Sequence, residues 1–326
     1  MASLKYMISE LVDEREKMER AVWQEYLQNK HGGAPKHPAT HNSIKQHKNN
    51  AIKYGAWCKR TYHSRTAEDC AQHIQDYVTF LVAKGLSAST IHTYLAGVCY
   101  AFNVDLADIK KPTRINARNQ RSRGVKPSDV RGDTQRDISP RLYDFANVVG
   151  CRRAEYAALR QSDLVTDVNG HLCVLIRRGK GGKKQYQRIL PEDIETVKTF
   201  FDGSDEFVFS RDEIKNKLDL HALRAQQARK AYAYYFDRLR NEPAYREILL
   251  KEIRNTWDAD DAERMEKGWK KKRWRQSHKL RGETRKLAAA HDLPVCYDRL
   301  AAMAVSIYHL AHWRLDVTID NYLIAM

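Results

Sequence analysis

Two side chains able to take part in phosphoryl chemistry lie near the carboxyl end of the sequence, His312 and Tyr322. A tyrosine phenol becomes a nucleophile when it loses its proton, and it can then form a covalent bond to phosphorus. Thr318 lies one helical turn before Tyr322, so the stretch also fits a closing helix in which Tyr322 only packs against the core. The two interpretations make different demands on the rest of the chain.

A phosphate-attacking tyrosine needs cations and further proton carriers, and the sequence supplies both upstream. A phosphodiester is anionic and unreactive, so fixed donors must neutralise the charge that develops during bond exchange. Arginine offers a planar, permanently charged fork that matches two phosphate oxygens. In chain order the candidates are Arg152 and Glu155 in Gly150-Cys-Arg-Arg-Ala-Glu155, Lys180 between two glycines, His221 and Arg224 in a His-x-x-Arg pair, His312 and Tyr322.

Each of these groups also has a structural interpretation. The two arginines of the first motif can be surface charges on a helix, and the two histidines can be satisfied core residues. Neighbouring residues of the same type leave two assignments open at this stage, namely Arg152 or Arg153, and Lys180, Lys183 or Lys184.

The composition indicates a folded protein whose surface attracts polyanions. The 326 residues are 42% hydrophobic and carry a formal net charge of +16, with a pI of about 9.5. This length suffices for two domains, and the charge makes double-stranded DNA the leading partner, ahead of an anionic membrane. No apolar run approaches the roughly 20 residues that span a bilayer, and the first residues lack a signal-peptide core. We therefore expect no membrane partner and a cytoplasmic location, associated with the nucleoid if the chain is bacterial or phage-derived.

Neither a metal nor a cofactor is expected. The six cysteines show no Cys-x-x-Cys pairing, which favours free buried thiols over disulfides or a zinc site. The histidines between residues 31 and 47 have no cysteine or carboxylate at metal-ligand spacing.

The amino-terminal part of the chain is predicted to be helical. Residues 4–30 read as one amphipathic helix that docks on the first domain, followed by a turn-rich linker, so that 1–40 forms a separate segment. Residues 41–105 are predicted to form a helical, DNA-binding domain, with helices at about 43–61, 67–84 and 88–103. Their basic face, including Lys45 and Lys48, fits either a DNA backbone or a solvated surface.

Residues 106–137 read as an interdomain linker, since regular periodicity fades there and basic residues dominate. A basic linker could run along the DNA backbone, and Arg118, Arg121 and Arg123 are therefore candidate DNA contacts.

Residues 138–326 are predicted to form a catalytic domain with helices, a glycine-rich β-hairpin and a closing helix at 297–311. The expected helices cover 139–149, 152–160, 191–201 and 217–240, and the hairpin begins at 171–176 with its turn around Lys180 and Lys183. A charged helical region, 243–286, holds three tryptophans among basic residues, which fits either a nucleic-acid contact or aromatic anchors on a solvated helix. Its basic run and the hairpin turn add the DNA-contact candidates Lys183, Lys184, Lys270, Lys271, Lys272, Arg273 and Arg275.

Taken together, the ordered motifs resemble the active-site boxes of the tyrosine recombinases, the phage-integrase and Xer-like family. Upstream, the stretch Gly85-Leu-Ser-Ala-Ser-Thr-Ile-His-Thr-Tyr-Leu-Ala96 resembles the third helix of that family's core-binding domain. The resemblance covers the chain from about residue 42, without the segment 240–290. It implies a mainly α fold with a small antiparallel sheet in two domains. The roles it implies are phosphate binding by Arg152 and Arg224, the nucleophile Tyr322, the general acid Lys180, the general base or its assistant His221, a phosphate hydrogen bond from His312, and bracing by Glu155.

The resemblance also implies a site-specific DNA recombinase that forms a 3′-phosphotyrosyl link, needs no cofactor, and acts as a homo-tetramer on paired sites with accessory DNA-bending proteins. A telomere resolvase or a type IB topoisomerase would use the same chemistry, and a catalytically silent DNA-binding protein on this scaffold is the alternative of another class. The sequence departs from the family in three places. Ala311 replaces a glycine, residues 240–290 look like an insertion between Arg224 and His312, and only four residues follow Tyr322.

Overall fold

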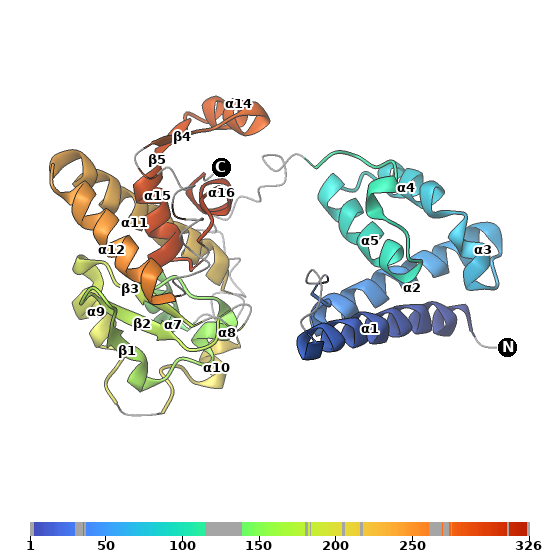
Figure 1. Cartoon of the computed structure of the whole chain (residues 1–326), viewed down its shortest axis with the longest axis horizontal. Coiled ribbons are helices and arrows are strands. Elements are labelled where there is room, and N and C mark those ends of the chain that lie inside the picture. Colours follow the sequence, from blue (N-terminus) through green and yellow to red (C-terminus); the bar gives the residue numbers. More distant parts are fainter. Residues whose placement is uncertain are drawn as a thin grey trace. The chain divides into compact units, whose positions relative to one another are not determined.

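The computed structural model describes residues 3–29, 35, 37–114, 139–179, 182, 184–203, 206–215, 218–260, 269, 274, 276–311 and 313–324. By its internal packing the chain divides into two compact units, Met1–Ile115 and Asn116–Met326. Most of the described chain is helical, and the strands form small antiparallel sheets (Figure 1). The predicted fold class is confirmed at that level. No described helix combines the length and apolar character needed to cross a membrane.

The amino-terminal unit is built from helices. They are α1 (Leu4–Asn29), α2 (His41–Tyr62), α3 (Ala67–Ala71), α4 (Ile74–Ala83) and α5 (Ala88–Ala101), followed by the 3₁₀ turn η1 (Leu106–Asp108). Thr40 and Ser87 cap α2 and α5 by accepting backbone N–H groups. The single helix predicted over 67–84 is wrong. A turn at residues 72–73 ends α3, and α4 begins directly after it with His73 as its N-cap residue.

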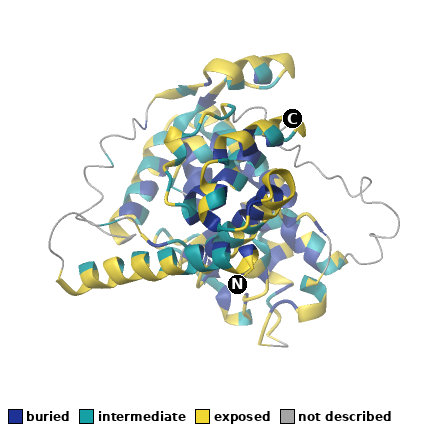
Figure 2. Cartoon of the chain, turned by 90° about the vertical axis from the view of Figure 1, so that its right-hand side faces the viewer, coloured by how far each residue is buried: buried dark blue, intermediate teal, exposed yellow. Residues whose placement is uncertain are grey.

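The helices of this unit enclose one apolar core. Leu4, Ile8 and Val12 of α1 are buried in the same cluster as Tyr54 of α2 and Leu95 of α5. Beyond Val12, α1 buries no residue, and its contacts include a hydrogen bond from Arg15 to the Tyr100 carbonyl and the packing of the Trp23 ring beside His37. Figure 2 shows this division of helices into buried and exposed faces.

The first residues of the predicted linker are fixed to the amino-terminal unit. Gln75 of α4 both donates to the Lys110 carbonyl (2.9 Å) and accepts its backbone N–H (3.1 Å). His92 of α5 hydrogen-bonds the Pro112 carbonyl at 2.9 Å.

The second unit contains the predicted hairpin and, beside it in the same sheet, the strand β1, which the sequence did not predict. In the three-stranded sheet, β2 (Leu172–Ile176) lies between β1 (Leu164–Thr166) and β3 (Gln185–Arg188). All pairs are antiparallel, and Ile176 pairs with Gln185 at the mouth of the hairpin turn. β1 is only three residues long, too short for a clear period-2 pattern.

Short helices surround this sheet. They are α7 (Pro140–Val148), α8 (Arg153–Tyr156), α9 (Ile194–Lys198) and α10 (Arg211–Ile214), with 3₁₀ turns η4 (Gln161–Asp163) and η5 (Pro191–Asp193). Ser139 caps α7 and Pro140 occupies its first turn, as the sequence predicts. The helices expected over 152–160 and 191–201 are much shorter than predicted.

The longer helices follow, α11 (Leu220–Asn241), α12 (Tyr245–Asp260), α14 (Gly282–Ala290) and α15 (Arg299–Tyr308). A second sheet pairs β4 (Ser277–Lys279) with β5 (Cys296–Asp298). The continuous helix expected over 243–286 is therefore wrong at β4, which needs the later β5 as its partner. Leu249 and Ile253 of α12 are fully buried against the unit's core.

Tryptophans of the predicted insertion are anchors in this structure. The rings of Trp257 and Trp274 are almost entirely buried. The rings of Trp269 and Trp313 pack beside them, tilted or edge-on, at centroid distances of 4.4–5.5 Å. Of the two interpretations of the tryptophan-rich segment, the described residues favour the aromatic anchor.

A buried ion network ties the insertion to the first sheet. Arg188 of β3 donates to Asp167 (2.7 Å) and to Glu252 of α12 (2.6 Å), and its guanidinium lies 3.5 Å from the Tyr308 ring centroid. Helix α12, in the segment outside the family resemblance, is thus part of the second unit's core.

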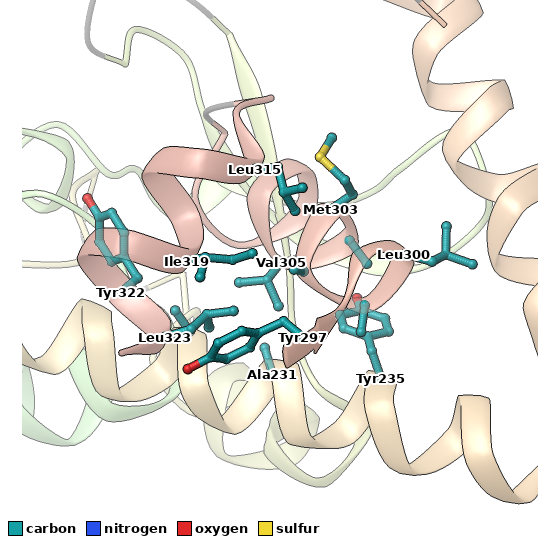
Figure 3. Packing of buried hydrophobic residues seen from close by; sticks show 14 of the residues in the cluster. Ala231, Tyr235, Tyr297, Leu300, Met303, Val305, Leu315, Ile319, Tyr322 and Leu323 are labelled. Atoms are coloured by element: carbon teal, nitrogen blue, oxygen red, sulfur yellow. The ribbon is translucent and has the colours of Figure 1, made fainter. Parts of the chain in front are cut away.

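The chain closes with α16 (Leu315–Thr318) and a π-helical turn, η6 (Ile319–Leu323). Figure 3 shows Ile319 and Leu323 packed toward Val305, while the Tyr322 hydroxyl points away from that cluster. Apolar contacts with α11 and α15 therefore fix the segment that carries Tyr322.

Candidate active site

Four of the predicted site residues line one cavity of about 680 Å³ in the second unit. These are Arg152, His221, Arg224 and Tyr322, which come from the start of α8, the first turns of α11 and the π-helical turn η6. The other lining residues are Cys151, Arg153, Gln185, Leu218, Asp219, Leu220, Ala311, Arg314, Val317 and Asn321.

Arg152 stands immediately before α8 and is coupled to Glu155. Its Nη1 lies 2.5 Å from Glu155 Oε1, and its backbone N–H donates to the other carboxylate oxygen at 2.7 Å. Glu155 is buried. Arg153 instead donates to the carbonyls of Ile214 and Leu218, at 2.6 and 2.7 Å. Arg152 therefore pairs with a carboxylate, whereas Arg153 binds backbone carbonyls.

Arg224 is fully buried, with 0% of its surface exposed. Its guanidinium donates to the carbonyl of Gly150 and, at 2.8 Å, to that of Leu310, and Nη1 lies 3.7 Å from Glu155 Oε2. Its Nε has no hydrogen-bond partner among the described residues. Arg224 thus binds two backbone segments together and keeps one N–H donor unused beside the cavity.

Gly150 packs closely against Arg224 at this contact. A Cβ built on it would lie 3.2 Å from both Cα and Cγ of Arg224, tighter than ordinary packing, and one of these neighbours is backbone. A side chain at residue 150 would therefore require Arg224 to shift by a few tenths of an ångström.

His221 is exposed on the first turn of α11, where Asp219 accepts the backbone N–H groups of His221 and Ala222 at 3.0 Å. Its ring centroid lies 5.6 Å from that of Tyr322, with the planes at 63°. The predicted base and the predicted nucleophile are therefore neighbours although about a hundred residues separate them in the sequence.

Tyr322 lies in the π-helical turn, with 5% of its surface exposed, and its carbonyl accepts a hydrogen bond from Arg229 of α11 at 3.3 Å. Single π-helical turns are rare and often occur at functional sites. This backbone bond and the packing of Ile319 and Leu323 are what hold the tyrosine in place.

Several predicted residues lie outside the described part of the chain. They are the predicted catalytic residues Lys180 and His312 and the DNA-contact candidates Arg118, Arg121, Arg123, Lys183, Lys270, Lys271, Lys272, Arg273 and Arg275. Among the described candidates, Lys45 and Lys184 are exposed, and Lys184 lies 5.2 Å from the Tyr186 ring. Lys48 forms an ion pair with Asp13 of α1 at 2.6 Å.

Sequence reasoning missed a group of buried polar residues behind the cavity. Gln187 of β3 donates from one amide nitrogen to the carbonyls of Gly150 (3.1 Å) and His309 (2.8 Å), and its oxygen accepts from the Cys151 thiol at 2.8 Å. This bridge runs parallel to that of Arg224, since both join the segment at residue 150 to the segment at residues 309–310. No motif marks Gln187. The only signal is the alternation of a strand, which puts Gln185 and Gln187 on the same face.

Among these buried polar residues, His309 has a strongly lowered pKa. Burial, followed by the charges of Arg188 and Arg224, lowers its pKa to about 3. Its ring nitrogens meet Gln227 Nε2 (3.1 Å) and the Tyr235 hydroxyl (3.2 Å). A neutral ring satisfied on both nitrogens anchors the segment before His312 to α11.

The described residues contain no group of three or more histidine, cysteine, aspartate or glutamate side chains arranged to hold a metal ion. Five cysteines are buried and Cys296 is exposed.

No protein-family model and no curated protein matches this sequence. Among solved structures, the chain is similar to the crystal structure of XerA recombinase, with a TM-score of 0.22 and 14% sequence identity. The match covers 66% of this chain and 84% of that one. A likeness of this size carries no inference about activity, so any assignment of function depends on the cavity and the residues that line it.

Proposed function

We propose that this protein cleaves and rejoins DNA through a covalent bond between Tyr322 and a 3′-phosphate. The observation that carries the proposal is the cavity itself. Arg152, His221, Arg224 and Tyr322 were selected from sequence segments up to 170 residues apart (322 − 152), and all four line it. Packing alone would not require a tyrosine, a histidine and two arginines to meet at one concave surface.

In the proposed step, the Tyr322 oxygen attacks the phosphorus of a DNA phosphodiester. The new O–P bond forms as the bond from phosphorus to the 5′ oxygen breaks, and the phenolic proton passes to His221 or to water that His221 orients. The leaving 5′ oxygen takes a proton, for which Lys180 is the proposed donor. The phosphotyrosyl ester conserves the bond energy, so attack by a 5′-hydroxyl reverses the step without a nucleotide cofactor.

The arginines and Glu155 would set the electrostatics of this step. Arg152 and Arg224 both approach the Glu155 carboxylate, at 2.5 and 3.7 Å. A phosphate entering the cavity would compete with Glu155 for these guanidinium groups, which are already oriented by it. Donors held in place before the reaction need little reorganisation when charge develops on the phosphate.

Double-stranded DNA is the proposed substrate, since the net charge of +16 favours a polyanion. The basic residues predicted in the helical unit, in the linker, at the hairpin turn and at 270–275 are its proposed contacts. Recombination between paired sites by a homo-tetramer is the proposed biological reaction. Telomere resolution and topoisomerase activity would share the same covalent step.

The decisive experiment compares Tyr322→Phe with Tyr297→Phe on a nicked DNA duplex that traps the cleaved strand. We expect the wild type and Tyr297→Phe to form a covalent protein–DNA product. Tyr322→Phe should form none. It should still bind DNA with near-normal affinity, because it loses only one hydroxyl.

Tyr297 is a fair control, since it is buried in the same apolar cluster and its hydroxyl has no hydrogen-bond partner among the described residues. A covalent product from Tyr322→Phe would show that another residue is the nucleophile. A wild type that binds DNA and never forms the product would favour the catalytically silent alternative.

A further inference from the structure

Strand β3 presents two buried glutamines to the interior on the same face, and their amides are used differently. Every polar atom of the Gln187 side chain has a protein partner, as its bonds to Gly150, Cys151 and His309 show. Gln185 is 7% exposed and lines the cavity, and its Nε2 has no hydrogen-bond partner among the described residues. Two residues of the same type, two positions apart, therefore have different roles.

An unused buried donor is costly to keep. Leaving a buried N–H without an acceptor costs about 1–3 kcal/mol, so most such groups in folded proteins are paired. Arg224 Nε is a second buried donor without a partner in the described chain, and Arg224 lines the same cavity. Both donors are buried atoms of residues that line one cavity, so small side-chain movements would let a ligand with acceptor oxygens pair with them.

The charges around the cavity define the chemistry of that ligand. The lining includes the cations Arg152, Arg153, Arg224 and Arg314. Among the described lining residues the one carboxylate is Asp219, which accepts two backbone N–H groups of α11. Glu155 lies behind the arginines and pairs with Arg152. An anion with several acceptor oxygens fits this set, and a phosphodiester is such an anion.

We propose that Gln185 binds the DNA phosphate in the cavity by donating its side-chain N–H to a non-bridging oxygen. This inference rests on the proposed function and adds a neutral donor to the two arginines. Gln185 is the first residue of β3, directly after the hairpin turn, and it pairs across the sheet with Ile176. A rigid strand thus positions its amide. The hydrogen bonds of Gln187 to the carbonyls of Gly150 and His309 tie the same strand to the segments that Arg224 also joins.

The test compares Gln185→Leu with Gln187→Leu. We expect Gln185→Leu to slow formation of the covalent DNA product by about 10- to 100-fold, as loss of a hydrogen bond to a charged group predicts. Its melting temperature should be unchanged or higher, because the variant removes an unpaired buried donor. Gln187→Leu should lower the melting temperature, because it leaves the Cys151 thiol and the His309 carbonyl without their partner. A rate loss without a stability loss separates phosphate contact from a purely structural role.

A second measurement does not depend on cleavage. The side-chain amide resonances of Gln185, identified by their absence from the spectrum of Gln185→Leu, should shift when inorganic phosphate is added to the full-length protein. The Gln187 amide should shift much less. An amide shift in a wild type that forms no covalent product would overturn the strand-cleavage proposal and support the anion contact. A covalent product formed at the wild-type rate by Gln185→Leu, or a Gln185 amide that phosphate does not shift, would overturn this inference.

Discussion

The two compact units bury different kinds of side chain. Among the described residues, the amino-terminal unit buries two polar side chains, Asn50 and Ser64. The second unit buries eleven, namely Glu155, Asp163, Gln185, Gln187, Arg188, Asp193, Arg224, Gln227, Ser306, His309 and Thr318. Buried polar groups cost free energy unless they are paired, so a chain concentrates them only where their positions matter.

The difference shows how each unit obtains its shape. Apolar packing and a few surface ion pairs define the helical unit, which tolerates changes that preserve volume. In the second unit, Arg224 and Gln187 bind distant backbone segments to each other with directional hydrogen bonds. Such bonds fix distances that packing alone leaves adjustable, which suits a site where an atom must attack another in line.

The largest effect should come from Arg224→Met, which keeps the length of the side chain and removes its charge. Breaking a buried ion pair by deleting one partner costs about 3–5 kcal/mol, because Glu155 and two carbonyls lose a donor. Urea unfolding should show this loss, and the covalent DNA product should disappear. A variant with wild-type stability would mean that the guanidinium does not hold the Gly150 and Leu310 segments together.

An effect of similar size is expected from acid, and His309 of the second unit should contribute to it. The pKa of His309 is lowered to about 3, whereas a histidine in the unfolded chain titrates near 6.5. Between these values the unfolded state binds a proton that the folded state excludes. Stability therefore falls as the pH drops from 6.5 towards 3, by up to about 1.4 kcal/mol per pH unit, and this loss is absent above pH 7.

His309→Gln removes the titrating ring and keeps polar atoms near Gln227. The variant should unfold more easily than the wild type at pH 7, and its stability should fall less steeply between pH 6 and pH 4. Parallel pH profiles for the two proteins would show that His309 is protonated in the folded state.

The sequence predicted most of the elements and those site residues that belong to motifs. Helical periodicity and capping residues such as Ser87 and Ser139 are local signals, and the structure places helix starts where they indicate. The ordered motifs selected Arg152, His221, Arg224 and Tyr322, which line one cavity.

What the sequence did not show depends on contacts between distant residues. β1 and β4 are strands because β2 and β5 pair with them, and each is only three residues long. Gln187 is important because it lies between segments more than a hundred residues apart, and a glutamine in a strand gives no local sign of that. The direction of the Arg224 fork likewise depends on distant residues, since it donates to the carbonyls of Gly150 and Leu310.

The smallest effects should arise from the basic face of the helical unit, where two predicted DNA contacts have different surroundings. Lys48 pairs with Asp13, both about one-third exposed, so Lys48→Met should cost at most about 1 kcal/mol of folding stability, and less at high salt.

Lys45 is exposed and has no ion-pair partner in the described chain. Its charge is available to a phosphate, so Lys45→Met should leave stability unchanged and reduce the salt dependence of DNA binding by about one unit of slope. Lys48→Met should reduce that slope less, because Lys48 would first have to break its ion pair with Asp13 before it could contact DNA. In a protein that keeps Lys48, Asp13→Asn should free this lysine and increase the salt dependence of DNA binding. If Lys48→Met reduces the slope as much as Lys45→Met, the ion pair between Lys48 and Asp13 opens when the protein binds DNA.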